Sequence, residues 1–220
     1  EAGGKRVRFH KDAADPSAAG PDAEGITVDA SGMVYIAAER NNSDKGTNYN
    51  TILMVDPSAP GPDVVAQAEW DLTASLPQVS ANMGIEAVEW VSNAAVEGVL
   101  FDQNTGAPFQ TANYPEAVAG GVFFVALEDN GHVYAYVLGA DGSVTQIADI
   151  DPMLGGAMAL DFDTYKNVLW VVADNGYANM SAKIALNGTQ TPDVVQMTAP
   201  AGVDTAANNE GFAIADATYT

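Results

Sequence analysis

Acidic side chains recur at equivalent places in a repeated sequence pattern. The repeat consists of two apolar segments, and it occurs three times. The first segment starts on an acid, except in the third repeat, where it starts on Met158, and the second segment ends on an acid. A fourth copy of the first segment lies near the C-terminus. The acids are Glu24, Glu86 and Glu210 at the starts, and Glu39, Glu128 and Asp174 at the ends. Carboxylates that gather closely raise one another's pKa unless a cation neutralises them. Oxygen ligands without His or Cys favour Ca²⁺, with Mg²⁺ as the alternative.

These acids gather if the segments are strands paired as hairpins. Around the turn at residues 31–32, a register that pairs Val28 with Tyr35 also places Glu24 opposite Glu39. A similar register in the third repeat places Met158 opposite Asp174. If the hairpins surround an axis, the acids form a ring at one mouth of the central channel. The pattern therefore predicts a cation site with six acidic ligands. In the alternative, the acids only accept hydrogen bonds from backbone N–H groups of adjacent hairpins.

The surrounding sequence indicates an all-β fold. Apolar runs of about five to eight residues, rich in Val, Ile and aromatic residues, are bounded by Gly-containing turns, which is typical of antiparallel hairpins. Four such strands recur three times, which is the pattern of β-propeller blades. We expect strands at 24–29, 34–39, 51–56 and 64–70, then 86–90, 123–128, 132–138 and 144–150, then 158–163, 169–174, 182–186 and 194–197. The aromatic residues expected to pack between blades are Phe123, Phe124, Tyr134, Tyr136, Trp90 and Trp170.

The flanking segments suggest that the propeller is larger than three blades. Residues 210–214 repeat the first strand of a blade, and residues 5–10 are expected to be the outer strand of a preceding blade. We therefore interpret residues 1–220 as a single β-propeller domain, or a fragment of one, with about three complete blades plus flanking strands. The alternative is a small four-bladed ring with a degenerate last blade.

Composition excludes several classes of function. The 220 residues carry 29 acidic and 8 basic side chains, a net charge of −21, with no cysteine and two histidines. Disulfides, thiolate zinc sites and thiol nucleophiles are excluded. The charge repels a phosphate backbone, so we expect no nucleic-acid partner. No apolar stretch approaches the roughly 20 residues of a spanning helix, so we do not expect an integral membrane protein. Such an acidic protein fits surroundings rich in salt or divalent cations.

Several segments resemble the bacterial phytase-like family, which is described as having esterase-like activity. They are DAEGI at 22–26, YIAAER at 35–40, GIEAVEW at 84–90, GVFFVALE at 121–128 with GHVYAY at 131–136, and NNEGFA at 208–213. The resemblance extends in order over nearly the whole chain. It implies a β-propeller that is secreted, periplasmic or associated with the cell envelope. Members of the family continue into a further strand, so the remaining blades of a parent propeller are candidate partners.

The family name suggests hydrolysis of phosphate esters, with Ca²⁺ as the cofactor. Cations held by the acids would bind phosphoryl oxygens and activate a water. Arg40 would clamp the phosphate, and Glu39 and Glu86 complete the candidate catalytic set. Alternatively, Arg40 pairs with Glu39 or another acid. The rival function is a non-catalytic propeller that binds a protein or glycan partner and holds a structural cation.

Overall fold

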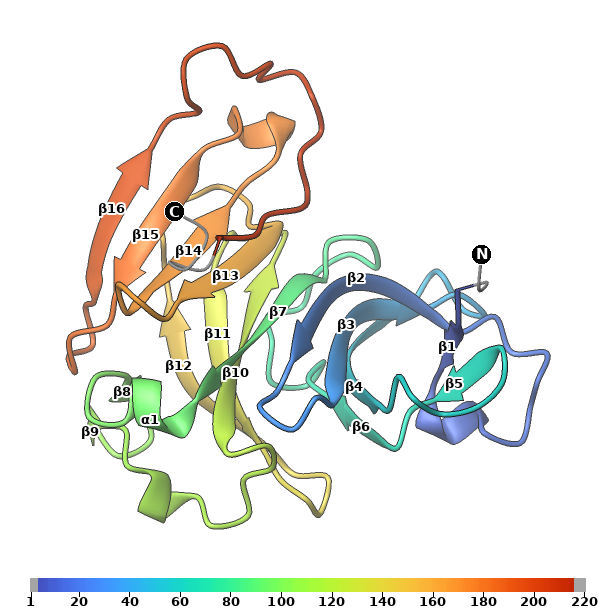
Figure 1. The fold of residues 1–220 in the computed structure, drawn as a ribbon. Coiled ribbons are helices and arrows are strands. Elements are labelled where there is room, and N and C mark those ends of the chain that lie inside the picture. The colour runs from blue at the N-terminus through green and yellow to red at the C-terminus, as the bar shows by residue number, and fades with distance from the viewer. Residues whose placement is uncertain (1–3, 216–220) are drawn as a thin grey trace.

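Three four-stranded antiparallel sheets follow one another along the chain in the computed structural model, which describes residues 4–215 (Figure 1). Strands account for 42% of the chain and helices for 6%. This composition confirms the predicted all-β class built from antiparallel hairpins. Within residues 4–215, no helix combines the length and apolar character that a membrane crossing requires.

Each sheet keeps its strands in chain order. The first sheet contains β2 (Pro21–Val28), β3 (Val34–Asn41), β4 (Asn48–Val55) and β6 (Ala68–Asp71). The second contains β7 (Ile85–Ser92), β10 (Gly121–Leu127), β11 (Val133–Leu138) and β12 (Val144–Ile150). The third contains β13 (Ala159–Asp163), β14 (Val168–Val172), β15 (Ser181–Ala185) and β16 (Asp193–Met197).

Short elements connect and flank these sheets. They are β1 (Arg6–Arg8), β5 (Asp63–Val65), β8 (Phe101–Asp102), β9 (Ala107–Pro108), the four-residue helix α1 (Asn93–Val96), and the 3-10 turns η1 (His10–Asp12), η2 (Thr111–Asn113) and η3 (Asn175–Tyr177). The hairpin of β8 and β9, together with α1 and η2, occupies the long connection between β7 and β10.

Three strand predictions are wrong. The strand expected at 64–70 is two strands, β5 and β6, and only β6 joins the first sheet. The segment 5–10 does not belong to a preceding sheet, because β1 pairs in parallel with β5. Residues 210–214 form no strand: the backbone N–H of Ile214 donates to the side chain of Asp161 on the edge strand β13 and not to its backbone.

The second sheet lies between the other two, so both of its faces are buried. On β10, Phe123 and Val125 face the first sheet, whereas Phe124 and Ala126 face the third. Successive side chains of a strand point to opposite faces, and this explains why residues 121–127 form an unbroken apolar run. Tyr134 and Tyr136 join Phe123 in the core, as expected. Trp170 does not: it lies on the outer face of the third sheet, in contact with Phe212.

The first strands of the three sheets, β2, β7 and β13, lie next to one another, with β7 in the middle (Figure 1). Gly25 allows the closest approach between β2 and β7. A Cβ atom at this position would lie 2.7 Å from Cα of Ala87 and 2.7 Å from the backbone nitrogen of Val88. Only a residue without a side chain allows the two backbones to meet in this way.

Gly25→Ala is therefore expected to lower the free energy of unfolding by about 2–3 kcal/mol, because the added methyl group forces two strand backbones apart. Urea denaturation measures the change. Gly46→Ala is the matched control, since a Cβ atom at Gly46 meets nothing within 4 Å. Equal stability of the two variants would contradict this account of the contact between β2 and β7.

Candidate metal centre

Three carboxylates converge where β2 and β3 meet. One oxygen each from Asp22, Glu24 and Glu39 can be chosen so that all three lie within 4.8 Å of one another. Glu24 is exposed, whereas Glu39 is only 2% exposed. The backbone N–H of Gly84 donates to Oε2 of Glu39 at 3.3 Å. The three residues thus offer oxygen ligands at one point. We call the end of the sheets where Asp22, Glu24, Glu39 and Glu86 lie the acidic rim.

Glu24 reaches this position through a β-bulge. The predicted register between β2 and β3 is wrong by one residue, because Thr27 and not Val28 pairs with Tyr35. The ladder is interrupted between Ala23 and Gly25, so Glu24 is an extra residue without a partner on β3. A bulge changes the direction of a side chain, and here the carboxylate of Glu24 joins those of Asp22 and Glu39.

Glu86 occupies the equivalent bulge in the second sheet. Ala87 pairs with Ala126 and Ile85 pairs with Leu127, which leaves Glu86 as the extra residue of β7. The carboxyl group of Glu86 lies close enough to Glu128 for the two charges to interact, and the backbone N–H of Glu128 donates to the carbonyl of Gly84 at 2.9 Å. The same irregularity therefore positions an acid in two successive sheets.

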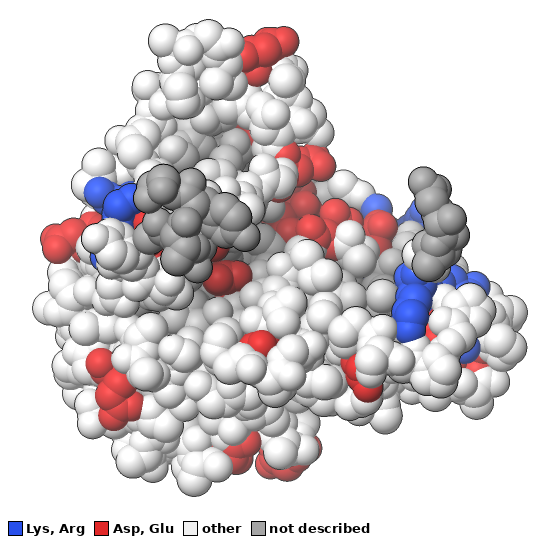
Figure 2. All heavy atoms as spheres, viewed as in Figure 1, with Lys and Arg blue, Asp and Glu red and all other residues white. Residues whose placement is uncertain are grey.

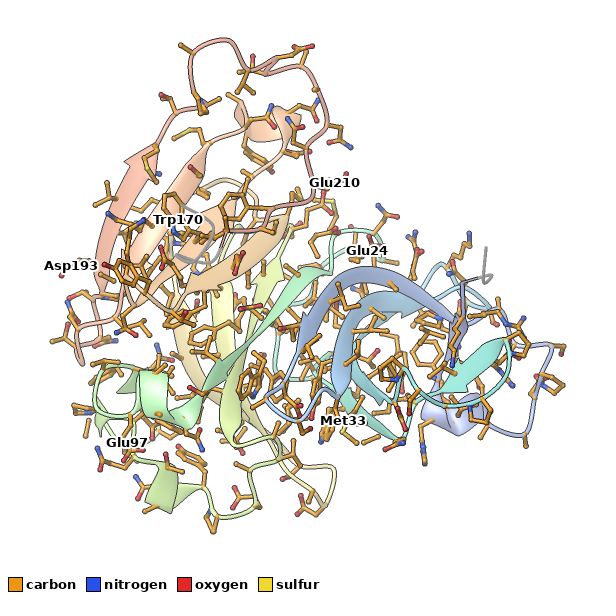
Figure 3. All side chains as sticks on the ribbon, in the orientation of Figure 1. Glu24, Met33, Glu97, Trp170, Asp193 and Glu210 are labelled. Carbon is orange, nitrogen blue, oxygen red and sulfur yellow. The ribbon has the colours of Figure 1, made fainter. Side chains whose placement is uncertain are left out.

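The acids that start the repeats line one cavity. Its volume is about 140 Å³, and its walls include Glu24, Glu86 and Glu210 together with Met158 and Phe212. Figure 3 labels Glu24 on β2 and Glu210 on the chain that follows β16. Met158 occupies the place that an acid occupies in the other repeats, so the third sheet contributes a thioether instead of a carboxylate to this wall.

Asp174 lies at the edge of this group. Ala159 pairs with Val172, so the register predicted for the third sheet is also wrong by one residue, and Asp174 lies beyond the paired strands. Its carboxylate caps η3 by accepting a hydrogen bond from the backbone N–H of Gly176 at 3.0 Å. Its charge acts on Glu128 and raises the pKa of that carboxyl group.

The concentration of negative charge shifts the pKa of these groups upward. Burial, and then the charges of Glu24 and Glu128, raise the pKa of Glu86 to about 9. The pKa values of Glu39 and Glu128 are raised as well, mainly by burial. The pKa of Glu24 is raised by partial desolvation and by the charges of Asp22, Glu39 and Glu210, although its side chain still reaches solvent. Figure 2 shows the acidic side chains gathered in the hollow between the first and third sheets. Either a proton or a cation must therefore compensate the charge.

Arg40 is the basic side chain at this site, and its donors are already in use. Its Nε donates to Asp22 at 2.7 Å and its Nη2 lies 2.6 Å from the same carboxylate. Nη2 also lies 3.4 Å from Glu39, and Nη1 donates to the carbonyl of Ala81 at 2.9 Å. Arg40 thus offsets one negative charge and anchors two of the candidate ligands.

Sequence reasoning missed two acids. Asp22 belongs to the three-carboxylate group, and the only signal for it is its position two residues before Glu24. Glu89 lies three residues after Glu86 and accepts from Oγ1 of Thr27 at 3.0 Å and from the backbone N–H of Phe162 at 3.4 Å. Burial raises the pKa of Glu89 to about 7. This side chain links the first strands of all three sheets.

No protein-family model matches this chain, and no curated protein is significantly similar to it. The resemblance to the phytase-like family therefore stays a prediction from the sequence.

Proposed function

We propose that this chain is a Ca²⁺-binding protein whose three sheets are blades of a β-propeller. The strand order supports the propeller, because each sheet runs in chain order from a first strand that neighbours the first strands of the other sheets. The remaining blades of a longer protein are then the natural partners of the two outer sheets. The acidic composition and the phytase-like resemblance support a location outside the cytoplasm, in the periplasm, envelope or medium.

The convergence of Asp22, Glu24 and Glu39, with Glu86 beside them, is the observation that carries the proposal. Each offers carboxylate oxygens, the ligands that Ca²⁺ and Mg²⁺ prefer. Ca²⁺ accepts six to eight oxygens in irregular geometry, whereas Mg²⁺ demands a regular octahedron and keeps several waters. Side chains that come from β2 and β3 of the first sheet and from β7 of the second suit the more tolerant ion.

Hydrolysis of a phosphate ester is the activity that such a centre could support. A bound cation binds phosphoryl oxygens and lowers the pKa of a bound water. The cavity beside Glu24 and Glu86 has room for small groups, since it measures about 140 Å³ and a water molecule takes about 30 Å³. Glu39 would serve as a ligand of the cation, and Glu86 would accept the proton of the bound water.

The pairing of Arg40 favours the second candidate, a non-catalytic protein with a structural cation. A guanidinium that already binds Asp22, Glu39 and the carbonyl of Ala81 must leave these partners before it can clamp a phosphate. In this form, the cation stabilises the rim and a face of the protein recognises a protein or glycan.

Calorimetric titration of the chelated protein with CaCl₂ and MgCl₂ tests cation binding. We expect Ca²⁺ to bind more tightly than Mg²⁺, and Glu24→Gln to weaken Ca²⁺ binding by at least about tenfold, which corresponds to about 1.4 kcal/mol. Asp193→Asn on β16 makes the same change of charge far from the rim (Figure 3) and is expected to leave the affinity unchanged. Absence of Ca²⁺ binding by the wild type would defeat the proposal.

Turnover of p-nitrophenyl phosphate, phytate and a short acyl ester, with Ca²⁺ and with chelator, separates the two candidates. Hydrolysis that requires Ca²⁺ and is lost in Glu86→Gln supports the phosphoesterase. Ca²⁺ binding without any turnover supports the structural cation.

A further inference from the structure

The chain after β16 crosses back to the acidic rim as an extended segment. We call residues 198–215 the C-terminal strap (Figure 1). The strap has no strand pairing among the described residues, and nearly all of its side chains are exposed. Its position therefore depends on a few side-chain contacts instead of a hydrogen-bond ladder.

Asn179, in the loop that follows η3, forms the first of these contacts. Asn179 is 8% exposed and has a positive φ of 51°. Its Nδ2 donates to the carbonyl oxygens of Thr205 at 3.0 Å and Ala207 at 3.3 Å. Its Oδ1 accepts from Nδ2 of Asn209 at 2.9 Å. One buried amide thus holds three residues of the strap.

The outer face of the third sheet forms the second contact. The ring of Phe212 lies 6.0 Å from that of Trp170, at an angle of 40°. The backbone N–H of Ile214 donates to the carboxylate of Asp161, which pairs with Trp170 in the sheet. Phe212 remains 37% exposed, so this contact holds the strap without burying it in a core.

With these contacts in place, Glu210 lines the same cavity as Glu24 and Glu86. Glu210 is close enough for its charge to act on both Glu24 and Glu128. A strap in this position therefore adds a negative charge to a site that already has an excess. Without a cation this repulsion opposes docking, and with a cation it becomes attraction.

We propose that the C-terminal strap docks in response to Ca²⁺, with Glu210 as its ligand. Trp170, Asn179 and Phe212 are positioning residues, which act on the cation only through Glu210. This inference rests on the proposed Ca²⁺ site. By linkage, an ion that favours the docked strap binds more tightly when the strap is free to dock.

Titration of Ca²⁺ into the wild type and five variants of the full chain tests the coupling. Glu210→Gln and Phe212→Ala are each expected to weaken Ca²⁺ binding by about tenfold, and the double variant by no more than either single one. Phe212→Tyr keeps an aromatic ring against Trp170 and is expected to restore the affinity. Val203→Ala, an exposed apolar residue of the strap, is the control that should bind as the wild type does.

Trypsin cannot report on a strap that contains no Lys or Arg, so docking is followed by limited proteolysis with elastase, a serine protease that cleaves after small residues and needs no metal ion. Ca²⁺ is expected to slow cleavage within residues 198–215 of the wild type, but not of Glu210→Gln. Ca²⁺ binding that is unaffected by Glu210→Gln and Phe212→Ala would overturn the inference while leaving the proposed function intact. If the wild type binds no Ca²⁺ at all, the proposed function itself fails.

Discussion

Addition of Ca²⁺ to the chelated protein is expected to raise its Tm by about 5–10 °C when the free ion is at 100 times its Kd. A ligand that binds only the folded state stabilises it by about 2.7 kcal/mol at that concentration, and each kcal/mol shifts the Tm of a chain this size by about 2–4 °C. The unfolded chain cannot bring Asp22, Glu24, Glu39 and Glu86 together, because β2, β3 and β7 position them. Differential scanning calorimetry with and without Ca²⁺ measures the shift.

The double variant Glu24→Gln/Glu86→Gln tests which residues produce this shift. It keeps the size of both side chains and removes the charge at both bulges, so Ca²⁺ is expected to change its Tm by less than about 2 °C. Asp193→Asn on β16 should respond as the wild type does. A full Ca²⁺ response in the double variant would mean that the ion binds elsewhere.

Without Ca²⁺, the protein is expected to become less stable as the pH rises from about 5 to 9. The pKa of Glu86 is about 9 in the folded state and 4.5 for the free side chain, so the folded state binds more protons than the unfolded state in this window. Stability falls with pH wherever that holds. Glu24, Glu39 and Glu128 shift in the same direction and add to the slope.

Glu86→Gln imitates the protonated side chain and removes the largest part of this slope. In Ca²⁺-free buffer the variant is expected to be more stable than the wild type at pH 8 by about 4–5 kcal/mol, since each pH unit above 4.5 costs the wild type about 1.4 kcal/mol, and equal to it near pH 4.5. Urea denaturation at a series of pH values measures the difference. If the wild type is instead more stable than the variant at pH 8, Glu86 is ionised and paired in the folded protein. That result would contradict the raised pKa of its buried carboxyl group.

The bulges explain why the acidic residues could be predicted but their neighbours could not. Pairing in the first sheet was expected to follow one register from the turn at Ser31-Gly32. In the structure, the register is broken at Glu24, where Gly25 packs on Ala87 of the next sheet. The pairing is already displaced by one residue at the turn, where Thr27 and not Val28 pairs with Tyr35, so the turn and this contact between sheets together separate the observed register from the predicted one.

The hydrogen-bond partners of Arg40 are a second feature that depends on the tertiary structure. Its position next to Glu39 in the sequence leaves two interpretations open, a cation that binds phosphate or a partner of Glu39 or another acid. The fold supports the second, because it places Asp22 across the strand pair and the carbonyl of Ala81 nearby, and these groups take up its donors. In the sequence, nothing distinguishes Glu89 from the other acids. In the structure, it accepts hydrogen bonds from Thr27 on β2 and from Phe162 on β13.

The amino-acid sequence alone determined the all-β class, the three sets of four strands, and the placement of acids at one end of the hairpins. It could do so because alternation, turn residues and repeats are local properties of a chain. The tertiary structure decided the bulges, the parallel pairing of β1 with β5, and the path of residues 210–214, which repeat a strand sequence yet form no strand. These features depend on which backbone lies alongside, and a strand exists only where another strand accepts and donates its hydrogen bonds.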